Sequence, residues 1–223
     1  MERKEIICSA YRMTGGNNFY DGMITCSTLS GKAVCRLVWA MNKAENDDYL
    51  EKALSGIPEN FSGKLLEVPV GTGILTMPVY QTMPEADITC LDYSADMMGQ
   101  AQEKANRLHL KSVTFRQGDV GALPYADDTF DIVLSLNGFH AFPDKQAAYR
   151  EVFRVLKPGG TFCGCFYVAG ECKQSDWFVR HVYEKTGFFT PPYETASGLK
   201  ARLDGMYTDV DMGNLKSMAW FVC

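Results

Sequence analysis

Short apolar runs alternate with helix-patterned segments from Lys64 onward, and this alternation restricts the possible folds more than any other feature. Continuous or alternating apolar runs predict strands, whereas apolar residues spaced three or four apart predict helices. Strands are expected at 65–68, 86–92, 113–117, 130–136 and 161–168, and helices at 74–83, 95–109, 144–156, 175–186 and 196–205. Strands that alternate with helices form βαβ units around a mainly parallel sheet.

Two further strands, near 207–211 and 217–223, are separated only by Gly213 and polar residues. We expect these strands to form a hairpin, which adds an antiparallel strand to the parallel sheet. Residues 1–62 are less regular, with helices expected at 33–40 and 47–54. We therefore predict an N-terminal cap or lid over residues 1–60 and an α/β domain over residues 61–223.

The composition, with 46% hydrophobic and 22% charged residues in 223, is typical of a globular protein with one core. The formal net charge of −5, without a dense Lys/Arg run, argues against a nucleic-acid partner. No apolar run approaches the ~18–20 residues of a membrane span, and the N-terminus does not resemble a secretory signal. We therefore expect a cytoplasmic protein without a membrane partner. Its eight cysteines include no C-x-x-C pair, so we expect reduced, buried thiols and no metal site.

The strand at 65–68 leads directly into Gly71-Thr72-Gly73. Glycines allow the backbone to approach a ligand closely, and the helix that follows offers free N–H groups and a positive dipole end. Glu67 lies at the end of the strand, where its carboxylate can accept hydrogen bonds or attract a cation. Asp92 ends the next strand, which places its carboxylate beside the loop and within reach of both ribose hydroxyls of a nucleoside.

Three features argue against a dinucleotide-dependent oxidoreductase. The loop lacks the third glycine that seats a pyrophosphate. The third strand closes with Gly118-Asp119-Val120, where Asp119 is placed to accept a hydrogen bond from an adenine amino group. Finally, the chain closes with a hairpin instead of a second mononucleotide-binding half.

With these features in order, the sequence resembles the class I S-adenosylmethionine-dependent methyltransferases, and most closely the branch of the ubiquinone and menaquinone C-methyltransferases and their small-molecule relatives. The matching segments are Leu66 to Gly73, Leu91 to Met97, Gly118 to Tyr125, Phe130 to Val133 and Lys157 to Gly160. The resemblance implies a doubly wound, mainly parallel, seven-stranded Rossmann-like sheet in which strand seven is antiparallel. It also implies that S-adenosyl-L-methionine donates a methyl group to a small molecule, leaving S-adenosyl-L-homocysteine.

The resemblance also implies which residues hold the cofactor. Glu67, Gly71 and Gly73 would border its methionine part, Asp92 would hold the ribose, Tyr93 and Met97 would flank the adenine, and Asp119 with the Val120 N–H would read the adenine edge. Asn137 would lie near the amino acid part. The predicted cofactor set is Glu67, Pro69, Gly71, Thr72, Gly73, Asp92, Tyr93, Met97, Gly118, Asp119, Val120 and Asn137. Pro69 stands where the family usually has glycine, so residue 69 cannot offer a backbone N–H.

The acceptor is expected beside the segment from Asn137 to Asp144, because ligands bind at the carboxyl ends of parallel strands. His140 is the histidine of this segment, and it is predicted either as a general base or as a wall of the pocket. Phe139 is expected to contact an apolar acceptor or to lie in the core. Tyr20 and Trp39 are expected to face the pocket from a mobile lid over residues 1–45.

The sequence leaves the acceptor molecule, the methylated atom and the oligomeric state open. Two other functions stay possible at this point: a non-catalytic module that binds S-adenosylmethionine as a sensor, and a thiol or metalloid methyltransferase that uses some of the cysteines.

Overall fold

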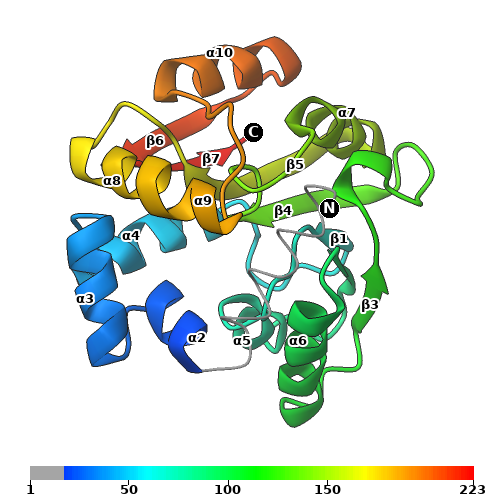
Figure 1. The fold of residues 1–223 in the computed structure, drawn as a ribbon. Coiled ribbons are helices and arrows are strands. Elements are labelled where there is room, and N and C mark those ends of the chain that lie inside the picture. The colour runs from blue at the N-terminus through cyan, green and yellow to red at the C-terminus, as the bar shows by residue number, and fades with distance from the viewer. Residues whose placement is uncertain (1–17) are drawn as a thin grey trace.

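The computed structural model describes residues 18–223 and contains one seven-stranded sheet with helices on both faces (Figure 1). The strand order is β3-β2-β1-β4-β5-β7-β6. The strands are β1 (Lys64–Glu67), β2 (Asp87–Asp92), β3 (Val113–Gln117), β4 (Phe130–Leu136), β5 (Leu156–Tyr167), β6 (Asp211–Leu215) and β7 (Met218–Val222). Strands β1 to β5 pair in parallel, whereas β7 is antiparallel to both β5 and β6. This arrangement confirms the predicted fold class.

Two apolar clusters cover the two faces of the sheet. The helices are α2 (Asn18–Ile24), α3 (Leu29–Val38), α4 (Lys43–Leu54), α5 (Thr76–Tyr80), α6 (Ala95–Arg107), α7 (Lys145–Val155), α8 (Lys173–Phe178), α9 (Glu184–Thr186) and α10 (Ala196–Met206), with a 3₁₀ turn η1 (Val120–Ala122) and a π-helical turn η2 (Val179–Tyr183). Helices α4, α5 and α6 contribute to one cluster, and α7 and α10 to the other. Leu65 and Leu66 of β1 are fully buried on opposite faces, as expected for a central parallel strand.

The strand order reverses between β1 and β4, which pair directly with Glu67 opposite Leu134. At such a switch point the loops after the two strands diverge to opposite faces and leave a crevice at the carboxyl edge of the sheet. The loop after β1 holds Gly71, and the loop after β4 begins at Asn137. The fold therefore places the two segments selected by the sequence analysis beside one another.

Capping interactions set several helix ends, including that of α4, which begins at Lys43 and not at the expected residue 47. The Ser94 side chain caps α6 by accepting a hydrogen bond from Met97 N. Helix α4 begins with a capping box, in which the Asn42 side chain accepts from Glu45 N and the Glu45 carboxylate accepts from Asn42 N.

Some predicted boundaries were wrong. The helix expected at 74–83 extends only over Thr76–Tyr80. The strand expected at 207–211 lies at Asp211–Leu215, so Gly213 is inside the strand and the hairpin turn contains Lys216 with φ 52°. Polar residues obscured this strand because β6 is an edge strand with a partly exposed surface.

Two further differences concern β5 and α7. Strand β5 begins at Leu156 and not at Thr161, and its pairing with β4 shifts across the irregular segment around Gly159, whose φ is 74°. Phe153 continues the apolar spacing of the helix expected at 144–156, yet it is 49% exposed and contacts Tyr207 edge-on. A helical stripe drawn from sequence spacing does not reveal how far the covering element reaches.

The prediction that all cysteines are reduced thiols was wrong for Cys26 and Cys35, which form a disulfide with a Cα–Cα distance of 6.4 Å. The pairing arises because α2 and α3 cross closely, a contact that spacing alone does not reveal. Cys90, Cys163 and Cys165 are free and buried, and Cys172 and Cys223 are free and partly buried. Cys8 lies outside the described residues.

Helices α2, α3 and α4 precede the first strand, and α4 lies against β5 and β7 (Figure 1). The predicted division near residue 60 stays a prediction, and residues 1–17 of the expected cap lie outside the described part. In residues 18–223, no helix combines the length and the apolar character needed to cross a membrane.

Candidate functional site

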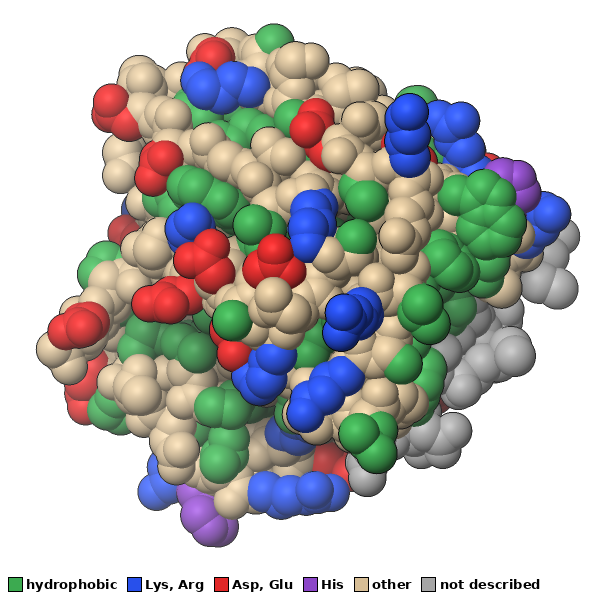
Figure 2. All heavy atoms as spheres, turned by 90° about the vertical axis from the view of Figure 1, so that its left-hand side faces the viewer, with side chains coloured by type: hydrophobic (Ala, Val, Ile, Leu, Met, Phe, Trp, Pro, Cys, Tyr) green, Lys and Arg blue, Asp and Glu red, His purple; other side chains and the backbone are tan. Residues whose placement is uncertain are grey.

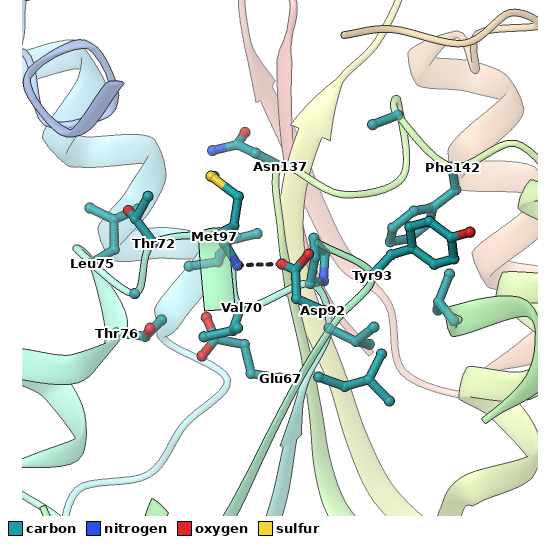
Figure 3. Close-up of a pocket in the computed structure, with 18 of the residues that line it drawn as sticks. Glu67, Val70, Thr72, Leu75, Thr76, Asp92, Tyr93, Met97, Asn137 and Phe142 are labelled. Atoms are coloured by element: carbon teal, nitrogen blue, oxygen red, sulfur yellow. Dashed lines mark hydrogen bonds between the residues drawn. The ribbon is translucent and has the colours of Figure 1, made fainter. Parts of the chain in front are cut away.

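A cavity of about 100 Å³ lies at the carboxyl edge of the sheet, in the crevice between the loops after β1 and β4 (Figure 3). It collects nearly the whole predicted cofactor set from four separate segments of the chain. The predicted residues that line it are Glu67, Pro69, Gly71, Thr72, Gly73, Asp92, Tyr93, Met97, Asp119, Val120 and Asn137. Gly118 lies outside the lining, where its N–H donates to the Asp92 carbonyl.

Asp92 holds the glycine loop in place. Its carboxylate accepts hydrogen bonds from Gly71 N and from Ser94 N, each at 2.8 Å, and Figure 3 shows the first of these. Burial raises the pKa of Asp92 to about 6, and the backbone N–H donors oppose part of this rise. Each carboxylate oxygen can accept more than one hydrogen bond, so Asp92 keeps acceptor capacity for hydroxyl groups of a ligand.

The two loop glycines serve different purposes. Both have positive φ, +57° at Gly71 and +67° at Gly73. A Cβ on Gly73 would lie 2.9 Å from Met77 Cγ and 3.0 Å from Ala101 Cβ, so this glycine lets α5 and α6 pack together. A Cβ on Gly71 would meet only Met97 Cε, at 3.8 Å, and would otherwise project into the cavity. Gly71 therefore leaves space for a ligand to contact the backbone.

Glu67 ends β1 beneath this loop and is almost fully buried. Its carboxylate accepts a hydrogen bond from Tyr80 Oη at 2.8 Å, and the Cys90 thiol lies 3.6 Å from the same oxygen. Burial raises the pKa of Glu67 to about 8, although the hydrogen bonds to its side chain lower it in part. A cationic group in the cavity would favour the ionised carboxylate.

Glu67→Gln should make the ligand-free protein relatively more stable at alkaline pH. The folded-state pKa of Glu67 lies above its usual value of 4.5, so its stabilising protonated form is lost as pH rises from about 5 to 8. We expect little difference between wild type and variant at pH 5, and a gain of at least about 1 kcal/mol for the variant at pH 8. Urea unfolding at both pH values measures this change, with Glu103→Gln on the exposed surface of α6 as the control. A pH-independent difference would contradict the assignment.

The three side chains predicted beside the adenine, those of Asp119, Met97 and Tyr93, also line this cavity. Asp119 caps the 3₁₀ turn η1, with its carboxylate accepting a hydrogen bond from Gly121 N at 2.9 Å. Met97 is buried, whereas the side chain of Tyr93 is 40% exposed. These residues line the cavity together with Val120, and the adenine position beside them stays a prediction.

A second cavity, of about 220 Å³, adjoins the first, and both are lined by Tyr20, Ile24 and Asn137. Its lining consists of Phe19, Tyr20, Met23, Ile24, Val34, Trp39, Met41, Asn46, Tyr49, Asn137, His140, Tyr183, Phe188, Phe189 and Met218. No Asp, Glu, Lys, Arg or Cys occurs among these residues. The predicted positions of Tyr20, Trp39 and His140 meet here, whereas Phe139 is fully buried in the core, 4.3 Å from Tyr149 between ring centroids.

His140 is held by the backbone at the end of the sheet. Its Nδ1 accepts a hydrogen bond from Tyr167 N at 3.3 Å, and its ring stacks on Phe189 with 3.9 Å between centroids. Burial, and to a lesser extent the charge of Lys145, lower the pKa of His140 to about 3. The imidazole is therefore neutral at physiological pH and a much weaker base than an ordinary histidine.

Asp21 connects the N-terminal helices to the loop of Gly71 to Gly73 and to α6, a contact that was not predicted from the sequence. The Asp21 carboxylate accepts a hydrogen bond from Thr72 Oγ1 at 2.6 Å and forms an ion pair with Lys104 Nζ at 2.9 Å. Tyr20, next to it, lines both cavities. The adjacent Tyr-Asp pair was the available signal, but only the fold brings α2 onto Thr72. The predicted mobility of this lid stays a prediction.

Comparison with known proteins agrees with this geometry. Residues 65–160, which include β1 to β4 and the glycine loop, match a family described as methyltransferase domain. This part of the chain is similar to methyltransferase domains. The family resemblance predicted from the sequence motifs is thereby confirmed.

Two similar proteins are named as methyltransferases. The chain is 37% identical over 119 residues to 2-methyl-6-phytyl-1,4-hydroquinone methyltransferase 2 of Oryza sativa, covering 52% of this chain and 32% of the relative. It is 36% identical over 97 residues to demethylmenaquinone methyltransferase of Deinococcus radiodurans, covering 44% and 40%. The chain thus spans well under half the length of these relatives.

The fold is also similar to that of a phosphoethanolamine N-methyltransferase from Haemonchus contortus, solved with S-adenosylhomocysteine. The TM-score is 0.64 at 18% identity, covering 88% of this chain and 46% of the other. This likeness concerns the arrangement of the sheet and its helices, and it extends beyond residues 65–160 to most of the chain.

Proposed function

We propose that the chain transfers a methyl group from S-adenosyl-L-methionine to a small, largely apolar acceptor. The observation that carries this proposal is the pair of adjoining cavities at the carboxyl edge of the sheet, joined at Tyr20, Ile24 and Asn137. The first has the residues that suit a nucleoside with an amino acid part, and the second has an aromatic lining without charged side chains. A transferase needs two such compartments that meet at one boundary.

The residues of the first cavity fit the cofactor. Asp92 would hold the ribose, Asp119 and Val120 would contact the adenine edge, and Glu67 with Asn137 would lie near the amino acid part. The open space at Gly71 admits a ligand directly against the backbone. S-adenosylmethionine would supply a methyl group already activated on a sulfonium.

The chain itself contributes binding, orientation and exclusion of water. Orientation of two reactants can account for about 7–11 kcal/mol of a barrier, which makes a dedicated general base unnecessary when the acceptor binds without its proton. Helices α2 and α3 provide part of the wall of the second cavity, and this wall would limit the access of water. Water near a sulfonium would compete as a nucleophile, so this cover has a chemical purpose.

Two alternatives receive less support. A sensor that only binds the cofactor has no use for the second cavity. A metalloid methyltransferase would need thiols at the site, and none of the cysteines in the described residues lines either cavity. On the one face shown in Figure 2, acidic, basic and hydrophobic side chains are interspersed, which suits a small-molecule enzyme better than a nucleic-acid binder. The cytoplasmic location stays part of this proposal.

Calorimetry with purified protein tests the cofactor assignment. S-adenosylmethionine and S-adenosylhomocysteine should bind with saturable heats, and NAD should not. At 100 times its Kd, either ligand should raise the free energy of unfolding by about 2.7 kcal/mol. Stabilisation by NAD together with no response to either sulfur compound would refute the proposal.

A further inference from the structure

We propose that His140 recognises the acceptor as a hydrogen-bond donor through Nε2–H, and that the acceptor therefore carries an uncharged or anionic oxygen at this point. This inference rests on the proposed function and specifies the chemistry of its second cavity. It assigns His140 to recognition of the acceptor and not to removal of a proton.

His140 completes the hydrogen bonding at the end of the sheet. In the parallel pair of β4 and β5, Asn137 N donates to the Cys165 carbonyl as the last bond of the ladder. Strand β4 then ends, with Asn137 at φ 54°, and the chain turns away. The next N–H of β5 on this edge, that of Tyr167, has lost its partner strand. His140 Nδ1 takes the place of the missing carbonyl and accepts this hydrogen bond.

The hydrogen bond from Tyr167 N determines which nitrogen of the imidazole carries the proton. A neutral imidazole carries one N–H, and a nitrogen that accepts from a backbone amide cannot carry it. Since Nδ1 accepts from Tyr167 N, the proton resides on Nε2. His140 lines the second cavity, and with Nδ1 occupied by Tyr167 N the ring nitrogen left for a ligand is Nε2, which is a donor in this tautomer and not the free lone pair of a general base.

The imidazole of His140 is surrounded by aromatic side chains. Phe189 stacks on the imidazole and fixes the plane of the ring. A flip of the ring within this plane would lose the Tyr167 hydrogen bond. The titratable side chains that share the cavity are phenols of Tyr20, Tyr49 and Tyr183, whose pKa values are all raised by burial. Within residues 18–223, the charge that acts on His140 is the Lys145 ammonium, which opposes protonation of the ring.

Together these contacts describe a cavity with apolar walls and a fixed donor. An acceptor with an aromatic or aliphatic body fits the walls, and an oxygen on that body pairs with Nε2–H. A carbonyl, an ether or a phenolate oxygen meets this requirement. An ammonium group does not, because it would place a donor against a donor.

Long-range ¹H–¹⁵N correlation NMR of the imidazole side chains tests the tautomer in the ligand-free protein. His140→Gln identifies the His140 signals by their loss. We expect the Nε2–H tautomer, unchanged from pH 5 to pH 8. A proton on Nδ1, or titration of the ring within this range, would overturn the proposal. This result does not depend on any cofactor, so it can fail while methyl transfer stands.

Two probes of nearly equal shape test the donor. Acetophenone carries a carbonyl where isopropylbenzene carries a methyl group, and the ratio of their affinities removes the shared packing contribution. The ratio should shift against acetophenone by about two- to tenfold in His140→Phe, which keeps a ring but has no N–H. His140→Gln retains an acceptor for Tyr167 N and a donor for the cavity, and it should keep the wild-type ratio. Equal ratios in all three proteins would show that His140 acts by packing alone and would refute the proposal.

Discussion

Gly71→Val should weaken binding of S-adenosylmethionine by at least about 100-fold, which corresponds to about 2.7 kcal/mol. The valine side chain would project into the cofactor cavity, where a Cβ meets only Met97 Cε. A β-branched residue also fits poorly at φ +57°, so the loop would lose its conformation as well as its free space. Calorimetric titration with S-adenosylhomocysteine measures the loss without turnover.

Gly159→Val is the matched control for this effect. Gly159 also has a positive φ, 74°, and nothing within 4 Å of its added Cβ, but it lies outside both cavities. The control therefore introduces the same kind of backbone strain, of order 1–3 kcal/mol, and leaves the cavity unfilled. If Gly159→Val weakened cofactor binding as much as Gly71→Val, loss of the fold and not filling of the cavity would explain both.

Asp92→Ala should weaken cofactor binding by about 10–100-fold. Hydrogen bonds to a charged group contribute about 1.5–3 kcal/mol, and the variant also removes the acceptor that holds Gly71 N beside the cavity. Asp87→Ala, at the exposed first residue of the same strand, should leave the Kd unchanged. An unchanged Kd in Asp92→Ala would mean that the ribose lies elsewhere.

A direct contact with the ribose is distinguishable from an effect on the loop alone. Adenosine and 2′,3′-dideoxyadenosine differ only in the two hydroxyls that Asp92 is proposed to hold. The wild-type preference for adenosine should fall by about tenfold in Asp92→Ala if Asp92 accepts from these hydroxyls. Loss of affinity for both nucleosides by the same factor would restrict Asp92 to a role in supporting the Gly71 loop.

The elements with strong local signals were predictable because local physics decides them. Strands β3 and β4 lie at the predicted residues, since short runs rich in β-branched, aromatic and other apolar residues have few alternatives to strand structure. The Ser94 cap of α6 is equally local, because a capping hydroxyl needs only the residues that follow it. By contrast, β6 was misplaced by about four residues, because an edge strand with polar residues depends on its neighbour β7 for its identity.

The grouping of residues around the first cavity was also predictable. Its residues follow the ends of consecutive parallel strands, and parallel strands bring their carboxyl ends to one edge regardless of sequence detail. The second cavity was less accessible to such reasoning, since its walls come from α2, α3 and the turn η2, which no periodic pattern connects. Tyr20 and Trp39 were predicted only as residues of a lid, and Phe189 and Tyr183 were not predicted at all.

The sequence alone determined the doubly wound sheet, the glycine loop and the acidic residues beside it, because hydrophobic periodicity and strand-end chemistry act over short stretches of chain. The tertiary structure alone decided the Cys26–Cys35 disulfide, the contact of Asp21 with Thr72 and the tautomer of His140. Each of these depends on segments that lie apart in the sequence and meet only after the helices pack. For His140, the residue type suggested a base, but the unpaired N–H of Tyr167 at the end of the sheet made it an acceptor at Nδ1 and thus a donor at Nε2.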